Sequence, residues 1–183
     1  MRLHEIILVM AVHSYHVLPD KACDFLIELF ESNPSQHERI DNDFKPTFTQ
    51  LNLNEYHGKI IPELCTYFEK SLDEYKSRVK HARYLPKVEL LEEFRIKKYN
   101  VGGMDRFDEH VDVVDHKTSK RCLAMIFYLN SVPVGGRTTF HQHSIRPTKG
   151  YVVAFPPTWE YPHSGEPPIS NPKYIMSTYL HYQ

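Results

Sequence analysis

The chain has 183 residues, 41% of them hydrophobic, and a formal net charge of −1 from 22 Lys and Arg against 23 Asp and Glu. This length supports one sizeable hydrophobic core and is too short for two full domains, so we predict a single domain over residues 1–183. The near-zero net charge excludes a strong overall field that would recruit nucleic acid or an anionic membrane.

The apolar run from Ile6 to Val12 is predicted to be a buried strand. The first five residues lack the positive segment of a signal peptide, and the run is far shorter than the roughly 20 residues that a membrane span requires. Cys23, Cys65 and Cys122 are odd in number and lie in apolar contexts, which suits reduced core thiols better than a disulfide framework. These features predict a cytoplasmic protein without a membrane segment.

Two amphipathic helices are predicted in the first half of the chain. Asp20 is the expected N-cap of the first, apolar residues follow it at helical spacing, and Asn33-Pro34 ends the pattern. From about Lys59 to Val79, apolar residues again recur every three or four positions between charged ones. Apolar helical stripes need a sheet face to cover, so residues 1–87 are expected to form a helical support region.

A basic stretch, KSRVKHAR over residues 76–83, follows the second helical pattern. Basic residues at a helix end complement the helix dipole and usually form a solvated face. We therefore do not interpret the stretch as a nucleic-acid site, and the sequence gives no strong nucleic-acid signal elsewhere.

From Val88 onward, short β-rich runs alternate with turn signals. Many short strands at regular spacing predict a sandwich or barrel, and a double-sheet jelly roll leaves a mouth between its sheets where ligands can enter. The predicted fold class is mainly β with flanking α-helices, in which N-terminal helices support a jelly-roll core over residues 88–183. The expected strands lie near residues 92–100, 107–114, 121–130, 137–146, 150–156, 160–164 and 173–182.

The stretch FDEHVDVVD, residues 107–115, places His110 and Asp112 two positions apart. On a strand these two side chains would share one face and could bind one metal ion inside the barrel. Non-haem Fe(II) oxygenases use two His and one carboxylate, and His163 is our candidate for the second His. A His-x-Asp pair by itself also occurs by chance on surface strands, so a purely structural role is the alternative.

A succession of motifs along residues 97–174 makes the metal site the stronger interpretation. In order they are KKYN, FDEHVD, IFYLN, GGRTTF, IRPTKG, YVVAFPP and HSGEPPISNPKY. This succession resembles the catalytic domain of the prolyl 4-hydroxylase-like branch of the 2-oxoglutarate and Fe(II)-dependent dioxygenases. The resemblance implies a double-stranded β-helix of the cupin type, in agreement with the jelly roll predicted from the strands.

The resemblance also implies which residues form the site. His110, Asp112 and His163 match the catalytic metal ligands of the family and would hold Fe(II). Lys173, ten positions beyond His163, matches the basic residue that pairs with the distal carboxylate of 2-oxoglutarate. The alternative for Lys173 is a solvated residue at the start of a strand.

Two tyrosines are implied as cosubstrate-binding residues. Tyr99 matches a tyrosine that precedes the His-x-Asp motif, and Tyr128 matches one whose hydroxyl reaches 2-oxoglutarate; ordinary core tyrosines are the alternative. The sequence departs from the family at Arg137, where many relatives have Glu, and at Asn171, where Gly is frequent. Asn tolerates left-handed backbone nearly as well as Gly, so that departure weakens the assignment little.

The implied activity is hydroxylation with succinate and CO2 as coproducts, which requires Fe(II), 2-oxoglutarate and O2, with ascorbate as the expected reductant. Peptidyl proline is the expected target, so a peptide or protein is the expected partner. The alternatives are the same chemistry on a nucleobase or small metabolite, or a non-catalytic jelly-roll binding module. No Arg follows Arg146, which weighs against a two-arginine nucleic-acid demethylase, and the intact ligand set weighs against a binding module. The particular substrate and the oligomeric state stay open.

Overall fold

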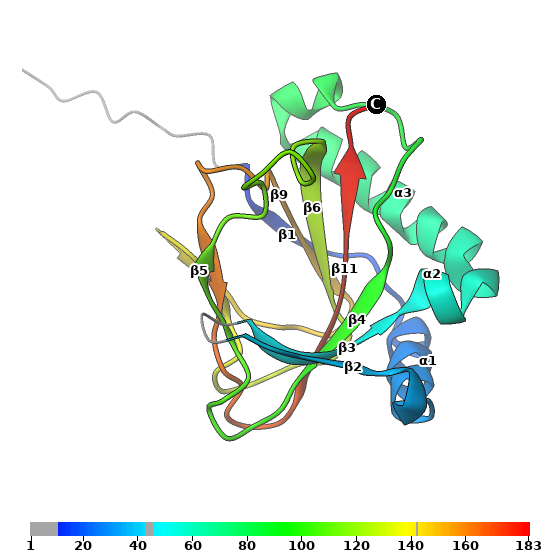
Figure 1. The fold of residues 1–183 in the computed structure, drawn as a ribbon. Helices are drawn as coiled ribbons and strands as arrows, with labels where there is room; N and C mark the ends of the chain where they lie inside the picture. Colours follow the sequence, from blue (N-terminus) through cyan, green and yellow to red (C-terminus); the bar gives the residue numbers. More distant parts are fainter. Residues whose placement is uncertain (1–10, 43–45, 142) are drawn as a thin grey trace, which may run out of the picture.

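The computed structural model describes residues 11–42, 46–141 and 143–183. Its framework is two antiparallel sheets that face each other (Figure 1). The large sheet contains, in spatial order, β1 (His13–His16), β9 (Tyr151–Phe155), β6 (Arg121–Tyr128), β11 (Lys173–His181), β4 (Arg95–Tyr99), β3 (Thr47–Asn52) and β2 (Glu38–Asp41). The small sheet contains β5 (Phe107–His110), β10 (His163–Gly165), β7 (Thr138–Phe140) and β8 (His143–Ile145). This arrangement confirms the predicted jelly roll with flanking helices.

Helices α1 (Asp20–Glu31), α2 (Leu53–Tyr56) and α3 (Ile61–Arg78) lie on the outer side of the large sheet (Figure 1). Short 3-10 turns occur at Pro34–Gln36, Gly58–Ile60 and Lys80–Tyr84. Phe30 of α1 and Phe68 of α3 are buried in one cluster with Phe127 of the large sheet. Each such buried side chain contributes roughly 1.5–3 kcal/mol, so the helices stabilise the sheet that carries the site.

The start of α1 differs from the prediction. Asp20 is the first helical residue rather than the N-cap, and Pro19 occupies the N-cap position without a side-chain bond. The Pro19 carbonyl accepts hydrogen bonds from the amides of Ala22 and Cys23, at 3.0 and 3.2 Å. Proline has no side-chain acceptor, so its backbone carbonyl accepts the hydrogen bond from the Ala22 amide that an N-cap carboxylate would otherwise accept.

The first half of the chain is less purely helical than predicted, because β1, β2 and β3 come from it. β2 is an edge strand of four residues and is mostly exposed, so it lacks the alternating apolar pattern that marks a strand in sequence. The strand expected over residues 6–12 falls outside the described residues except for Ala11 and Val12, which have no regular structure.

Two further strand predictions need correction. The strand expected over 137–146 is a hairpin of β7 and β8 instead, and the one expected over 107–114 ends at His110.

Cys23, Cys65 and Cys122 are free, as predicted, and two of them are buried. Within the described part of the chain, no helix is long and apolar enough to cross a membrane.

A second, inner cluster fills the space between the two sheets. It includes Phe48, Tyr99 and Tyr128 from the large sheet and Phe140 from the small one. These aromatic side chains fill the interior of the barrel next to the candidate site, so polar groups among them are held away from bulk water.

Candidate metal centre

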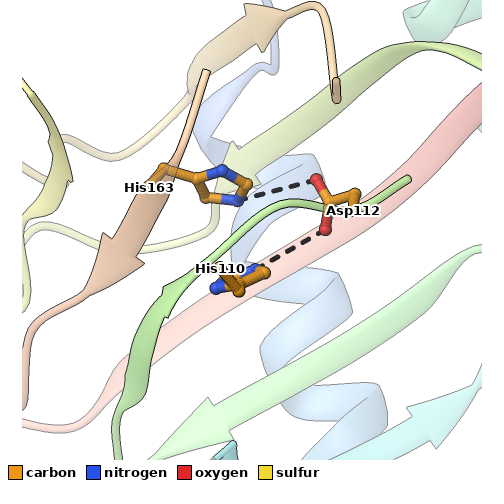
Figure 2. A group of neighbouring side chains, drawn as sticks. All are labelled: His110, Asp112 and His163. Carbon is orange, nitrogen blue, oxygen red and sulfur yellow. Dashed lines mark ion pairs between the residues drawn. The ribbon is translucent and has the colours of Figure 1, made fainter. Parts of the chain in front are cut away.

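The three predicted metal ligands converge between the sheets (Figure 2). His110 ends β5 and His163 begins β10, and antiparallel pairing places these two residues opposite each other. Nε2 of His110 lies 3.6 Å from Oδ1 of Asp112, and Nε2 of His163 lies 3.6 Å from Oδ2. One potential ligand atom from each residue lies within 4.8 Å of the others, which is close enough to share one ion.

Asp112 is oriented by contacts outside the strand, because β5 ends two residues before it. The amides of Asp112 and Val113 both donate to the carbonyl of Pro157, each at 3.1 Å. Nη1 of Arg121 donates to the Asp112 carbonyl at 2.8 Å. Strand alternation therefore does not explain the shared direction of His110 and Asp112; the turn after β5 does.

The hydrogen bonds of the two histidines leave their Nε2 atoms free. Nδ1 of His110 is 2.8 Å from the Asp108 carbonyl, and Nδ1 of His163 is 3.1 Å from the Tyr161 carbonyl. A carbonyl oxygen can only accept, so each Nδ1 carries the hydrogen and each Nε2 offers a lone pair. Burial also lowers the pKa of His163, against the attraction of Asp112, which favours the neutral imidazole that binds metals.

The Asp112 carboxylate is held in its ionised form. Burial raises its pKa, but the contacts with the imidazoles of His110 and His163 and the hydrogen bond from Tyr179 together lower the pKa below its usual value. The Tyr179 hydroxyl donates to Oδ1 at 2.8 Å. The guanidinium of Arg121 lies 4.1 Å from the centroid of the Tyr179 ring, so the group that fixes the Asp112 backbone also supports the tyrosine.

Sequence reasoning did not identify Arg121 or Tyr179 as site residues. Tyr179 had one usable signal, since it lies an even number of positions from Lys173 on β11 and therefore shares its face. Arg121 acts on a backbone carbonyl across a turn, and no spacing in the sequence predicts such a contact.

The donor set fits a divalent iron site. Two neutral imidazole nitrogens and one carboxylate are the ligands with which non-haem Fe(II) oxygenases bind their metal while leaving positions open. Here these groups lie between the sheets of a jelly roll, with outer contacts that set their direction. Fold and site together define the class of non-haem, metal-dependent oxygenases with a jelly-roll core.

A narrow cavity of about 40 Å³ extends from the three ligands to Lys173. Lys173 is 2% exposed, and its Nζ donates to the Gly136 carbonyl at 2.9 Å and lies 4.7 Å from the Tyr99 ring centroid. Among the described residues, no carboxylate lies within 4.0 Å of this ammonium. Burial lowers the pKa of Lys173 to about 8, against the attraction of Glu166. A buried ammonium is costly without a counter-charge, so the cavity favours an anionic ligand.

The turn beneath Lys173 depends on two glycines. Gly135 and Gly136 have φ values of +73° and +67°, a region that favours glycine. A Cβ on Gly135 would lie 2.6 Å from the Pro167 carbonyl oxygen, too close for any other residue. The paired glycines therefore allow the chain to present the Gly136 carbonyl to the lysine.

The two tyrosines predicted to bind the cosubstrate lie in different positions relative to the cavity. Tyr99 lines the cavity beside Lys173. Tyr128 is fully buried, and its hydroxyl donates to Oγ1 of Thr138 at 2.6 Å. Thr138 rather than Tyr128 lines the cavity, so any influence of Tyr128 on a bound ligand passes through the threonine.

Comparison with known proteins shows which oxygenase family the chain resembles. Residues 94–181 match the model of the 2OG-Fe(II) oxygenase superfamily. A search of curated protein sequences found no match. Among solved structures, the viral collagen prolyl hydroxylase of Paramecium Bursaria Chlorella virus-1, in its complex with 2OG, superposes with a TM-score of 0.71 at 20% identity, over 94% of this chain and 97% of that one.

Two other neighbours have the same fold. The prolyl-4-hydroxylase of Pseudomonas putida has a TM-score of 0.67 at 16% identity, over 95% of this chain and 94% of its own. A prolyl hydroxylase from Trichoplax adhaerens, solved with a peptide fragment of a hypoxia inducible factor, has a TM-score of 0.70 at 13% identity, over 93% and 83%. Residues 94–181 thus match the 2OG-Fe(II) oxygenase superfamily, and this match implies the use of Fe(II), 2-oxoglutarate and O2.

Proposed function

We propose that the protein hydroxylates proline residues in peptides, with conversion of 2-oxoglutarate to succinate and CO2. The observation that carries the proposal is the placement of a buried Lys173, without a carboxylate partner among the described residues, at one end of the cavity and of His110, Asp112 and His163 at the other. The structural neighbours named prolyl hydroxylases support the choice of proline, and the one solved with a peptide supports a peptide substrate.

The roles of the residues follow from their atoms. His110 and His163 would bind Fe(II) through Nε2, and Asp112 through its carboxylate. Lys173 would bind the distal carboxylate of 2-oxoglutarate. Tyr99 would pack beside that carboxylate. Thr138 would offer its hydroxyl to the cosubstrate, held in place by Tyr128.

The bound iron would supply activation of O2, coupled to the oxidative decarboxylation of 2-oxoglutarate. The chain itself contributes geometry and exclusion of water. The aromatic cluster that contains Phe140 and Phe155 packs against His163, with ring centroids at 5.6 and 4.6 Å. This apolar wall beside His163 would exclude water from the site once Fe(II) is bound.

Turnover tests this proposal directly. We expect purified protein with Fe(II), 2-oxoglutarate, O2 and ascorbate to form succinate faster when a proline-containing peptide is present, because substrate-coupled turnover exceeds the uncoupled reaction. Succinate is measured together with a mass gain of one oxygen in the peptide. Matched peptides with Ala in place of Pro are the control. Stimulation by nucleosides or small metabolites instead of peptides would refute the proline assignment.

Removing the Tyr179 hydroxyl is expected to weaken metal binding without unfolding the protein. Tyr179→Phe deletes the donor to Oδ1 of Asp112, and loss of such an outer partner typically weakens metal affinity about tenfold or more. Anaerobic Fe(II) titration measures the effect. Tyr174→Phe is the matched control, because that hydroxyl lies on the same strand and donates to Glu31 outside the barrel. Equal Fe(II) affinity in Tyr179→Phe and the parent would show that this hydroxyl does not position the ligand.

A further inference from the structure

Lys97 carries a positive charge where the metal cavity meets a wider groove. Its side chain lines the narrow cavity with the three metal ligands and also a neighbouring groove of about 440 Å³. Ser177 and Tyr179 of β11 line both spaces as well. A substrate that enters through the groove and reaches the metal therefore passes Lys97.

Alternation along β4 explains this position. Arg95, Lys97 and Tyr99 point into the barrel, whereas Lys98 points to the opposite face and pairs with α1. Tyr99 lies at the Lys173 end of the cavity, and Arg95 lines the outer groove. Lys97 thus lies between the cosubstrate end of the cavity and the outside.

The carboxylates near the inner part of the groove already have partners. Glu92 accepts hydrogen bonds from Nε and Nη2 of Arg121, at 2.7 and 2.6 Å. Glu93 pairs with Arg95. Each of these two glutamates therefore pairs with a cation other than Lys97, and Glu38, which lines the groove on β2, accepts a hydrogen bond from Gln50 at 2.6 Å.

Lys97 itself is partly buried and has no ion-pair partner in the described part of the chain. Its Nζ lies 5.1 Å from the ring centroid of Phe48. Burial lowers the pKa of Lys97 to about 8, against the attraction of Asp112. A divalent ion bound to Asp112 would weaken the attraction between this carboxylate and the Lys97 ammonium. The ammonium would then gain more stabilisation from another anion.

The charges of the loaded site point the same way. The positive charges of Fe(II) and Lys173 would cancel the negative charges of Asp112 and 2-oxoglutarate. Lys97 adds a positive charge that none of these groups balances. In a partly desolvated site this surplus favours a substrate that brings a negative charge of its own.

We propose that Lys97 binds a carboxylate of the substrate, located within a few bonds of the carbon that is hydroxylated. The inference rests on the proposed function and narrows its substrate class to acidic peptides. The carboxylate can come from an Asp or Glu beside the target residue or from the free C-terminus of the peptide, since both offer the same charge-assisted hydrogen bond to an ammonium.

The test is binding of a pentapeptide library to protein loaded with 2-oxoglutarate and Mn(II) under anaerobic conditions. Each position carries Asp, Asn, Lys, Pro or Ala, and each peptide is made with a free and an amidated C-terminus. The variants are Lys97→Met, which keeps the length of the side chain, and Lys97→Glu, which reverses its charge. Lys98→Met is the matched control on the opposite face of β4. Thermal unfolding confirms that each variant is folded.

The parent and Lys98→Met are expected to bind peptides with a carboxylate about tenfold more tightly than their amide counterparts, because a charge-assisted bond replaces a neutral one. Lys97→Met should lose this preference, and Lys97→Glu should favour Lys over Asp. A parent that binds acidic and amide peptides alike, or binds none, overturns the proposal, as does a preference that survives in folded Lys97→Met.

The same library separates this inference from the proposed function. Enrichment of carboxylates without enrichment of Pro would retain the role of Lys97 and reject proline as the target. Enrichment of Pro without enrichment of carboxylates would retain proline as the target and reject the proposed role of Lys97. A preference confined to peptides with a free C-terminus would identify the terminal carboxylate as the group that Lys97 binds.

Discussion

Replacing His110, Asp112 or His163 with Ala is expected to weaken Fe(II) binding by more than about 100-fold and to abolish turnover. Loss of an outer partner alone typically costs 10–100-fold in metal affinity, so loss of a ligand should cost more. The three ligand atoms lie within 4.8 Å of one another, and each is needed to complete the donor set. Anaerobic Fe(II) titration with colorimetric detection of bound iron measures the change.

The fold should survive these substitutions. The three ligands lie between the sheets, apart from the cluster that the helices bury against the large sheet, so this core stays intact although His163 also contacts Phe140 and Phe155 of the inner cluster. His116→Ala is a suitable control because His116 lies exposed in the loop that follows the site. If a folded Ala variant of any ligand still bound one equivalent of Fe(II) with the parental affinity, the proposed metal centre would be wrong.

The three candidate ligands could be named from the sequence because each lies in a motif that resembles the dioxygenase family. His110 and Asp112 are neighbours in one motif, and His163 lies in a second motif between an aromatic strand and a turn. The pairing of β5 with β10 then places His163 opposite His110. The physical reason given for Asp112 was wrong, however, since its direction comes from hydrogen bonds to Pro157 and Arg121 and not from strand alternation.

The groups that support the ligands could not be predicted in the same way. Arg121 contacts a backbone carbonyl, and any residue at position 112 would offer the same acceptor. Lys97 looks like an ordinary surface lysine in sequence, because adjacent Lys98 has the same charge and faces outward. Only the three-dimensional pairing of β4 with its neighbours shows which of the two lysines faces the cavity.

The fold shows a similar division. The long strands β6 and β11 were predicted nearly to their ends, since eight or nine β-forming residues give a clear signal. β2 and β3 were missed, although they complete one edge of the large sheet. Glu38 and Arg39 of β2 are exposed, and short edge strands gain their order from pairing with a neighbour more than from burial.

The second large effect is expected at Lys173. Lys173→Ala should raise the dissociation constant of 2-oxoglutarate about ten-fold to a hundred-fold, as expected for the loss of roughly 1.5–3 kcal/mol of charge-assisted bonding. Fe(II) binding should stay near the parental value, because Lys173 contacts the Gly136 carbonyl and the Tyr99 ring but none of the metal ligands. Calorimetric titration of 2-oxoglutarate under anaerobic conditions measures the change.

Two further variants separate charge from packing at this position. Lys173→Met keeps most of the side-chain volume beside Gly136 and should lose affinity as Ala does, if the ammonium is what binds the carboxylate. Lys173→Arg should recover only part of the loss, since a planar guanidinium does not fit the place of a compact ammonium without adjustment. Lys149→Ala, which removes a surface ion pair with Asp24, serves as the control. Unchanged affinity in Lys173→Ala would show that a group other than Lys173 binds the distal carboxylate of 2-oxoglutarate.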